Sequence, residues 1–415
     1  MSVNPEKTAS AFLTVDEALA RVSGGFSPLS AEQVALPDAL GRVLAAGVAA
    51  RLTQPPKAVS AMDGYAVRAA DVATVPVTLT QIGESQAGKG FDGEIGAGEC
   101  TRIFTGAPLP KGADAIVIQE VVDADGDAIT VKEASEIDAD VRPAGLDFAV
   151  GDVLLEAGKC MTARDIGLAA AMNVPWLMVR RRPRIAFIAT GDEVVMPGDT
   201  VGSDQIISSN SLALDAFIQV MGGEPVNLGI ARDTEDSLRQ ALAGAKGCDA
   251  LVTIGGASVG DYDLVRQVMG ADGLELNFYK IAMRPGKPLI FGHWQGIPVL
   301  GLPGNPVSAG VTSVIFLRAA MAVMLGTGDG GLETETVTLG ANVPANGKRL
   351  DLMRAILSTD ADGLLTATPF SRQDSAMMAT FAKSDCLLIR PIGAPAATAG
   401  ERVEIVRLDT GLGGF

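Results

Sequence analysis

The chain has 415 residues, of which 49 are acidic and 33 are basic, so its formal net charge is −16 at pH 7. An acidic surface repels phosphate backbones and anionic lipids, which argues against a nucleic-acid or membrane partner. No stretch of eighteen apolar residues is free of charge or glycine, and residues 1–10 lack the apolar segment of a signal peptide, so we expect a soluble cytoplasmic protein of several domains.

The chain before residue 181 has the pattern of helical segments on either side of a β-rich insertion. Apolar periodicity predicts three helices, over 13–22, 30–49 and 166–172. Thr162 to Asp165 resembles a capping box that opens the last of them. Between these segments, apolar and polar residues alternate with frequent glycine, which predicts strands. We expect the helical segments to pack together as one discontinuous domain around an insertion, with boundaries of 1–50 with 149–180 and of 51–148.

Apolar strands alternate with amphipathic helices from 181 to 329. The predicted helices cover 210–221, 234–245, 263–269 and 307–325. This alternation predicts a parallel sheet with helices on both faces, a three-layer α/β/α domain. Ligands of such folds bind beyond the carboxyl ends of the strands, so the turns that follow the strands form the candidate site. The remaining residues, 330–415, contain strand-like runs at 386–390 and 402–408 and predict a small β-barrel or sandwich.

Four turns that follow predicted strands carry glycine, hydroxyl or carboxylate groups. In chain order they are Thr190 to Glu193, Asp233, Gly255 to Asp263 and Pro303 to Ser308. In the third turn, Ser258 supplies a hydroxyl, and Asp261 and Asp263 supply hard oxygens suited to Mg²⁺ or to a ligand hydroxyl. Asp263 is alternatively the cap of the next helix. Agreement among four separate turns indicates a binding site at this edge of the sheet.

The turn from Pro303 to Ser308 has the strand, tight turn and helix start that are typical of an anion site. Free N–H groups and the positive end of a helix favour an anion, and glycine lets a phosphate approach the backbone. Just upstream, Lys280, Arg284 and Lys287 flank a proline-glycine turn, and in an extended segment the first two share a face that clamps an oxyanion. Each feature has an alternative. The prolines and glycine of the turn could serve only to end the strand and start the helix, and the cations could form an ordinary solvent-exposed basic face. Because the chain is acidic, the basic cluster favours a phosphate-bearing ligand.

The insertion contains two further polar turns. Asp63 stands before Gly64 and a predicted strand, and Thr105 stands before Gly106. Turn chemistry alone also explains both segments.

The cysteines and the single histidine exclude several chemistries. Cys100, Cys160, Cys248 and Cys386 are far apart in the sequence, which predicts neither a zinc site nor a disulfide framework, and we expect all four to be buried apolar residues. His293 lies in a predicted hairpin turn. One histidine in such a turn argues against Ser-His or Cys-His catalysis.

The motifs taken together resemble those of one family over nearly the whole chain. The matching segments are Ala61 to Ala66, Thr105 to Pro108, Thr190 to Glu193, Gly255 to Asp263, Pro285 to Pro288 and Pro303 to Ser308. The chain resembles the molybdopterin molybdenumtransferases of the MoeA type and is similar to the C-terminal domain of gephyrin. The resemblance implies an L-shaped homodimer of four-part subunits, with a cleft between the α/β domain of one subunit and the insertion of the other. It also implies that adenylylated molybdopterin and molybdate give molybdenum cofactor and AMP, assisted by Mg²⁺.

The resemblance and the chemistry of the turns together assign the candidate site residues. The resemblance implies catalytic roles for Asp63, Thr105, Asp147, Glu193, Lys280 and Arg284, and functional positions at Asp233, Asp263, Pro303, Pro306, Arg354 and Ser375. The turns add ligand-binding positions at Gly255, Gly256, Ser258, Lys287, Gly304, Asn305 and Ser308. For Mg²⁺ we expect Glu193, Asp233 and Asp263 as ligands. Cations in this set would offset the repulsion between two oxyanions.

Two other functions share parts of this pattern. A molybdopterin adenylyltransferase has the α/β domain but does not need the insertion around Asp63 or the C-terminal strands. A scaffold protein on the same fold would bind adenylylated molybdopterin without releasing AMP. For the enzyme, the resemblance implies small-molecule substrates and, as protein partners, the adenylyltransferase or the recipient molybdoenzymes.

Overall fold

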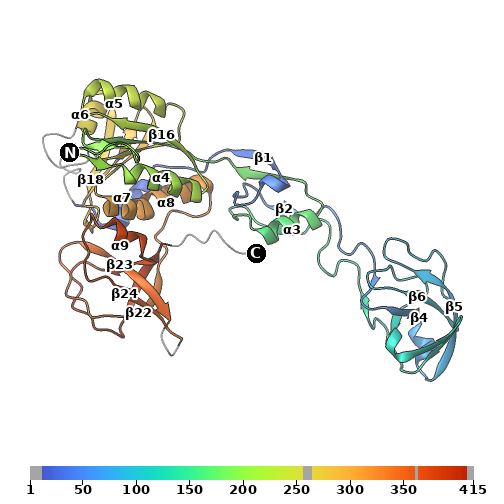
Figure 1. Ribbon diagram of the computed structural model, residues 1–415. Coiled ribbons are helices and arrows are strands. Elements are labelled where there is room, and N and C mark those ends of the chain that lie inside the picture. Colours follow the sequence, from blue (N-terminus) through green and yellow to red (C-terminus); the bar gives the residue numbers. More distant parts are fainter. Residues whose placement is uncertain (1–11, 256–263, 360–362, 409–415) are drawn as a thin grey trace, which may run out of the picture.

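The computed structural model describes residues 12–255, 264–359 and 363–408. The chain is elongated (Figure 1). An α/β part and a C-terminal barrel lie at one end, a small mixed part lies in the middle, and the β-rich insertion lies at the far end. The insertion is therefore separated from the α/β part along the length of the molecule.

The α/β part is built on a six-stranded sheet. In spatial order its strands are β16 (Glu224–Ala231), β13 (Arg184–Thr190), β17 (Ala250–Ile254), β21 (Ile297–Leu302), β20 (Pro288–Trp294) and β18 (Leu274–Lys280). The first four run parallel, as predicted, but β20 is antiparallel to both of its neighbours, β21 and β18, so the sheet is mixed. The reason is the two-residue turn at Gln295 and Gly296, whose φ angles of 49° and 81° suit a tight hairpin. His293 lies in β20 beside that turn.

Helices cover both faces of this sheet, which confirms the three-layer α/β/α prediction. One face packs against α4 (Ser209–Val220), α7 (Pro306–Thr312), the π-helical turn η5 (Ser313–Leu317) and α8 (Arg318–Leu325). The other packs against α5 (Glu235–Leu242), the short η4 (Ala243–Ala245) and α6 (Leu264–Ala271). The segment Pro306–Leu325 is long and apolar enough to cross a membrane, but 78% of its most apolar window is buried inside the structure. It is the core helix of this part.

The first helix, α2 (Val15–Ser23), forms as predicted and has a capping box at Thr14 and Glu17. We expected it to pack with the other N-terminal segments, but it does not. Its apolar side, including Ala18 and Val22, joins the core formed with α8. The buried residues of α2 and α8 lie in one cluster, whereas those of the middle part form a separate cluster.

The middle part contains strands where the sequence predicted a helix over 30–49. That segment forms β1 (Ala31–Ala35), the short η1 (Leu36–Asp38) and β2 (Val48–Ala49). β1 pairs with β12 (Trp176–Arg180), and β2 pairs with β11 (Val153–Leu155). Pairing with strands more than a hundred residues away overrides the local periodicity. The helix α3 (Ala163–Ala171) forms with the predicted capping box at Thr162 and Asp165.

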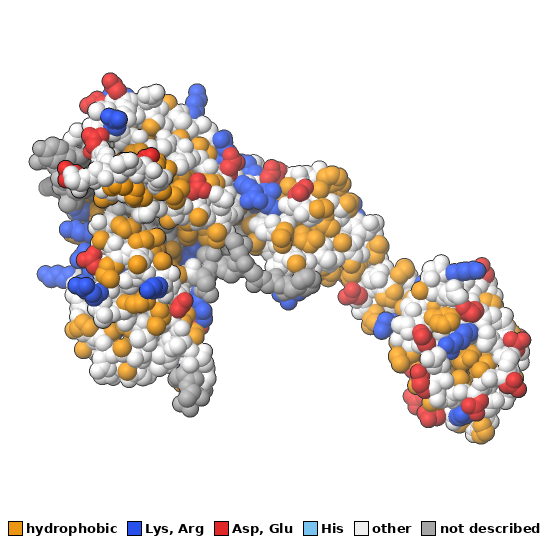
Figure 2. Space-filling view, in the orientation of Figure 1, with side chains coloured by type: hydrophobic (Ala, Val, Ile, Leu, Met, Phe, Trp, Pro, Cys, Tyr) orange, Lys and Arg blue, Asp and Glu red, His pale blue; other side chains and the backbone are white. Residues whose placement is uncertain are grey.

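Residues on both sides of the insertion share the core of the middle part, which includes Leu44, Phe148 and Met172. Hydrophobic side chains also gather on its surface (Figure 2). Trp176 and Met178, on the outer side of β12, are 54% and 44% exposed. Within residues 12–255, 264–359 and 363–408, no side chain covers these two.

The insertion is rich in strands, as its alternating pattern predicted, and six of them form one sheet. In spatial order its strands are β7 (Ala115–Ile118), β4 (Gly64–Val67), β6 (Glu99–Ile103), β5 (Val77–Ser85), β9 (Ala128–Val131) and β8 (Val122–Asp125). Smaller elements are β3 (Val59–Ser60), η2 (Ala69–Val72), η3 (Gln119–Val121) and β10 (Val141–Arg142). Its buried residues lie in two clusters of its own.

The C-terminal region is a closed five-stranded barrel. Its strands follow the order β23 (Leu350–Thr359), β24 (Leu365–Pro369), β22 (Glu335–Leu339), β26 (Arg402–Arg407) and β25 (Cys386–Arg390), and β25 pairs back to β23. The short β19 (Met283–Arg284) of the α/β part joins β23. The short helix α9 (Met378–Ala382) lies beside α7. The predicted strands at 386–390 and 402–408 are confirmed.

Three of the four cysteines are buried, as expected. Cys160 is exposed, so the prediction is wrong at that position. It precedes the capping box at the start of α3, where the chain lies at the surface of the middle part.

Candidate functional site

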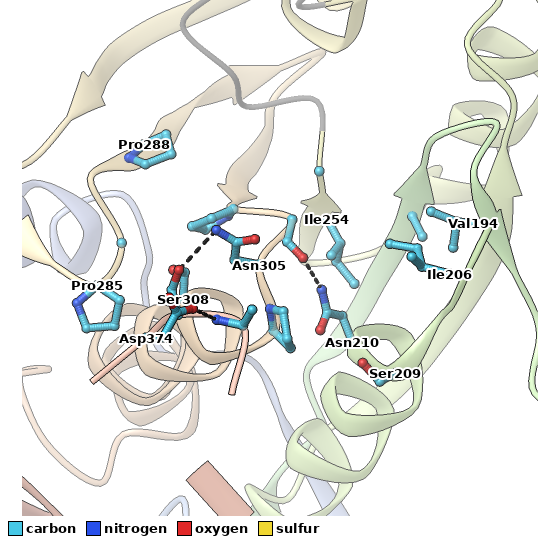
Figure 3. Close-up of a pocket in the computed structure, with 18 of the residues that line it drawn as sticks. Val194, Ile206, Ser209, Asn210, Ile254, Pro285, Pro288, Asn305, Ser308 and Asp374 are labelled. Atoms are coloured by element: carbon cyan, nitrogen blue, oxygen red, sulfur yellow. Dashed lines mark hydrogen bonds between the residues drawn. The ribbon is translucent and has the colours of Figure 1, made fainter. Parts of the chain in front are cut away.

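A cavity of about 980 Å³ lies at the carboxyl ends of β13, β17 and β21, between the α/β part and the barrel. Figure 3 shows Asn305, Ser308 and Asp374 on one side and Val194 and Ile206 on the other. The last two belong to the short parallel pair β14 (Val194–Val195) and β15 (Ile206–Ile207). The cavity brings together these predicted residues: Glu193, Gly255, Arg284, Lys287, Pro303, Gly304, Asn305, Pro306, Ser308 and Ser375.

Two glycine turns approach one another at the back of the cavity. Gly255 has a φ of +85°, and a Cβ on it would lie 3.1 Å from the carbonyl oxygen of Thr190. A Cβ on Gly304 would lie 3.7 Å from the Cα of Gly255. The backbone at Gly255 therefore requires glycine. Gly256, Ser258 and Asp263, also predicted to bind ligand, lie outside the described residues.

The β21–α7 turn is tied to the barrel and to α4. Asn305 donates through Nδ2 to Ser375 Oγ at 3.1 Å, and the backbone N–H of Val307 donates to the Ser375 carbonyl at 3.1 Å. Asn210 donates through Nδ2 to the Gly304 carbonyl at 2.7 Å. One of the helix-start N–H groups that we expected to be free for an anion is thus already used by Ser375.

Arg284 lies in the cavity wall but its charge is engaged. It forms an ion pair with Asp351 of β23, whose side chain is 5% exposed. The hydrogen bond to Asp351 raises the pKa of Arg284. This pair joins the α/β part to the barrel through the β19–β23 pairing.

Lys280 and Arg284 do not share one strand, contrary to the prediction. β18 ends at Lys280, and Arg284 lies in β19, because Ala282 donates to the Leu13 carbonyl and turns the chain towards the barrel. The Lys280 ammonium lies 4.6 Å from the Tyr279 ring centre and 3.3 Å from its hydroxyl, outside the cavity lining. Lys287 does line the cavity, and its ammonium lies 5.5 Å from the Phe12 ring centre.

Glu193, Asp192 and Asp233 lie near one another, and of these three Glu193 lines the cavity. Glu193 lines the cavity, and its side chain folds back over Gly191, where a Cβ would lie 2.5 Å from the carboxylate. The backbone N–H of Asp233 donates to Asp192 Oδ1 at 3.2 Å. Burial, and then the charges of Asp192 and Glu193, raise the pKa of Asp233. In the part of the chain that the structure describes, no three His, Cys, Asp or Glu residues are grouped as a metal site.

The barrel contributes a buried arginine near the cavity. Arg354 is 1% exposed, and it donates through Nη2 to the Asp374 carbonyl at 3.2 Å. Its Nε is buried without a partner, and burial lowers the pKa of its guanidinium. Gln373 bonds both the N–H and the carbonyl of Arg354, at 2.9 and 3.0 Å. Arg354 is therefore beside the cavity, while Gln373, Asp374 and Ser375 form its wall.

The predicted residues of the insertion form a separate group. Asp63 Oδ1 accepts from the Thr105 backbone N–H at 2.7 Å and from its hydroxyl at 2.8 Å. These two bonds, and then the charge of Arg102, hold the pKa of Asp63 below its usual value. Asp147 lines a second cavity of about 710 Å³ within the insertion. The main cavity does not include these three residues, and the insertion lies at the far end of the chain (Figure 1).

Several residues of the cavity were missed by the sequence reasoning. They are Thr190, Ser208, Ser209, Asn210, Arg349, Gln373 and Asp374. Thr190 lies in one of the four predicted turns, but no feature of the sequence indicated a role for it. Arg349 stands two residues before Asp351 in a basic segment, which was a usable signal. Nothing local distinguishes Gln373, since its position depends on how the barrel closes.

Comparisons with known proteins cover most of the chain. Residues 13–173 match the MoeA N-terminal region (domain I and II), 186–322 match a probable molybdopterin binding domain, and 336–408 match the MoeA C-terminal region (domain IV). A molybdopterin molybdenumtransferase of Haemophilus influenzae is 32% identical over 95% of this chain and 98% of its own length. Molybdopterin molybdenumtransferase 2 of Mycobacterium tuberculosis is 34% identical over 81% of this chain and 85% of its own length.

The fold agrees with these matches. The crystal structure of a molybdopterin biosynthesis MoeA protein from Pyrococcus horikoshii superposes with a TM-score of 0.84, at 30% identity, over 96% of this chain and 100% of that chain. A second structure of MoeA from Pyrococcus horikoshii OT3 gives a TM-score of 0.82 at 26% identity. Sequence and structure agree over all four parts of the molecule, and the chain therefore belongs to the MoeA family of molybdopterin molybdenumtransferases.

Proposed function

We propose that this chain inserts molybdenum from molybdate into adenylylated molybdopterin and releases AMP. The observation that carries the proposal is the cavity of about 980 Å³ at the strand ends, lined by Arg284, Lys287 and Arg349. Cations at such a site offset the repulsion between molybdate and a phosphate linkage. A cavity that holds both reactants also provides much of the rate of a transfer reaction.

Mg²⁺ assistance is part of this proposal. Burial, and then the charges of Asp192 and Glu193, raise the pKa of Asp233, and a divalent cation held by these hard oxygens would offset the repulsion between the carboxylates. We assign Glu193 and Asp233 as ligands, with Asp263 as a third from outside the described residues. When bound, the ion would withdraw negative charge from the phosphate oxygens.

A homodimer would complete the site. Asp63, Thr105 and Asp147 lie in the insertion, away from the main cavity of their own chain. A second copy that placed its insertion over this cavity would bring the two groups together. The exposed apolar surface at Trp176 and Met178 supports such an interface. A cytoplasmic location and transfer to the adenylyltransferase or molybdoenzymes stay predictions.

The first test measures AMP released from adenylylated molybdopterin with Mg²⁺, with and without molybdate. We expect release that requires molybdate and is lost in Glu193→Ala. Ligand that binds without any AMP release would support the scaffold alternative. Formation of adenylylated molybdopterin from ATP would support the adenylyltransferase alternative.

The shared cleft is tested by mixing two inactive variants, Asp63→Ala and Glu193→Ala. In a mixed dimer, one site combines both intact residues, so random mixing should restore about a quarter of wild-type activity. Mixed variants that stay inactive, although mass spectrometry shows that subunits exchange, would contradict a shared cleft. Activity in each separate variant would contradict the assigned roles.

A further inference from the structure

The connection between β24 and α9 forms part of the barrel wall of the cavity. Its residues Gln373 to Ala376 line the cavity, and within the described chain the whole connection, 370–377, belongs to no strand or helix. Backbone groups outside regular structure need other hydrogen-bond partners. The bonds made by side chains therefore determine where this wall lies.

The side-chain amide of Gln373 continues the pairing of β23 beyond the end of β24. The strand β24 ends at Pro369, and Phe370 still donates its N–H to the Arg354 carbonyl at 3.0 Å. The chain then leaves β23, and Gln373 supplies the next bond, because its Oε1 accepts from the Arg354 backbone N–H at 2.9 Å. Its Nε2 donates to the carbonyls of Arg354 and Phe370 at 3.0 and 2.8 Å. One amide thus acts as acceptor and donor at the strand end.

The residue after Gln373 is held from the same strand. The buried Arg354 donates through Nη2 to the Asp374 carbonyl at 3.2 Å. The backbone N–H of Ala376 donates to Asp374 Oδ1 at 2.8 Å, which closes a tight turn around Ser375. The side chain of Asp374 lies beside the cavity (Figure 3).

Ser375, at the tip of this turn, meets the start of α7. Its hydroxyl accepts from Asn305 Nδ2 and its carbonyl accepts from the Val307 N–H, both at 3.1 Å. The path from the barrel strand β23 to the β21–α7 turn therefore runs through Gln373 and then Ser375. Loss of the Gln373 amide would leave Ser375 bonded to α7 but less firmly held by the barrel.

We propose that Gln373 is a positioning residue, which holds Ser375 against the start of α7 and so sets the spacing between the two walls of the cavity. It acts through Ser375 rather than through the substrate. An amide is suited to this place because a carboxylate of the same shape accepts hydrogen bonds but donates none. The inference rests on the proposed function, because it concerns the cavity in which that reaction takes place.

Two variants separate the loss of the side chain from the loss of its donors. Gln373→Ala removes the amide, and Gln373→Glu keeps its shape but cannot donate to the two carbonyls when ionised. Gln240→Glu is the matched control for the added charge, because Gln240 is exposed on α5 and outside the cavity lining. Thermal unfolding shows which variants are folded at the assay temperature. If Gln373→Ala does not fold, Gln373→Glu is used alone.

The position of the wall is measured without turnover, by NMR hydrogen exchange of the Val307 amide. This N–H donates to the Ser375 carbonyl, so its exchange should become roughly five- to tenfold faster in the folded Gln373 variants. The Ala309 amide, which donates to the Asn305 carbonyl at 2.9 Å within α7, should exchange as in wild type. Equal acceleration at both amides would show a general loss of stability and would overturn the inference, as would unchanged exchange at Val307.

Steady-state kinetics test whether the effect reaches the reaction through Ser375. The KM for adenylylated molybdopterin should rise roughly five- to tenfold in the Gln373 variants, with little change in kcat, and Gln240→Glu should match wild type. When each Gln373 variant is combined with Ser375→Ala, the rise in KM should fall short of the product of the two single effects, because the two residues act on one contact. Combination with Ser371→Ala should give the full product.

Two kinetic outcomes would overturn the inference. One is a KM in the Ser375→Ala combination that equals the product of the single effects, since Gln373 would then act independently of Ser375. The other is a wild-type KM in the folded Gln373 variants, which would leave the proposed function standing. If wild type itself releases no AMP, the proposed function fails, and Val307 exchange still decides whether Gln373 holds the wall.

Discussion

Asn305 and Ser375 are joined across the cavity by a side-chain hydrogen bond of 3.1 Å. One residue starts α7 of the α/β part and the other belongs to the barrel, so the bond links the two walls of the site. The backbone bond from Val307 to the Ser375 carbonyl runs beside it. The position of the barrel therefore determines the shape of the cavity.

Ser375→Ala removes the side-chain bond but leaves the backbone bond. Because Asn305 is exposed and can bond water instead, we expect the free energy of unfolding to fall by about 1 kcal/mol or less. The KM for adenylylated molybdopterin should rise, because the side-chain hydrogen bond that joins the two walls of the cavity is lost, and this effect should be larger than the effect on stability. Denaturant unfolding and steady-state kinetics measure both effects. Ser371→Ala, at an exposed serine outside the cavity lining, is the control. Equal kinetics for the two variants would show that the side-chain hydrogen bond between Asn305 and Ser375 does not affect substrate binding.

Gly191→Ala should displace the Glu193 carboxylate. Gly191 has a φ of +135°, and its added Cβ would lie 2.5 Å from Glu193 Oε2. Gly198→Ala is the matched control, because Gly198 has a φ of +98° but nothing within 4 Å of the added Cβ. Both variants should lose about 1 kcal/mol of stability from backbone strain. Only Gly191→Ala should lose AMP release. Similar activity in both variants would show that Glu193 need not be held in this position.

Thr105→Val should raise the pKa of Asp63. Thr105 donates two hydrogen bonds to the charged carboxylate, and Val keeps only the backbone donor. A lowered pKa favours the folded state above the unfolded value of about 3.9, and this contribution is lost as pH falls through the folded pKa. In Thr105→Val this contribution should be smaller, and its loss should be complete at a higher pH. NMR titration of the Asp63 carboxyl carbon measures the shift, and Thr105→Ser, which keeps the hydroxyl, should titrate like wild type.

Asp233→Asn should stabilise the fold at neutral pH. The pKa of Asp233 is raised by burial and by Asp192 and Glu193, so the folded state binds this proton more tightly than the unfolded state. Its ionised form therefore costs stability above the folded pKa, and the difference between variant and wild type should vanish below about pH 4.

Added Mg²⁺ provides a second measurement on the same variant. Thermal unfolding should show that Mg²⁺ stabilises wild type more than Asp233→Asn, because a ligand that binds the folded state raises its stability. Asp204→Asn, at an exposed aspartate between β14 and β15, controls for the change in net charge. Equal Mg²⁺ responses in wild type and Asp233→Asn would remove Asp233 from the proposed ligand set.

Local patterns were sufficient to predict much of the architecture. The alternation of strands and helices predicted the three-layer part, and the Thr162 capping box predicted the start of α3. Glycine turns after β13, β17 and β21 identified much of the cavity, including Gly255 and Gly304. These features depend on residues close in sequence, such as a cap and its helix or a strand and the turn that follows it.

Other features depended on contacts between distant segments. The helix predicted over 30–49 was wrong because Ala31–Ala35 pairs with Trp176–Arg180. Arg284 met Asp351, and Arg349 and Gln373 reached the cavity, because the barrel closes against the α/β part. Short-range periodicity carries no information about such partners. Backbone hydrogen bonds and buried charges must be satisfied by whichever segment the tertiary fold brings near, and that requirement decided the walls of this site.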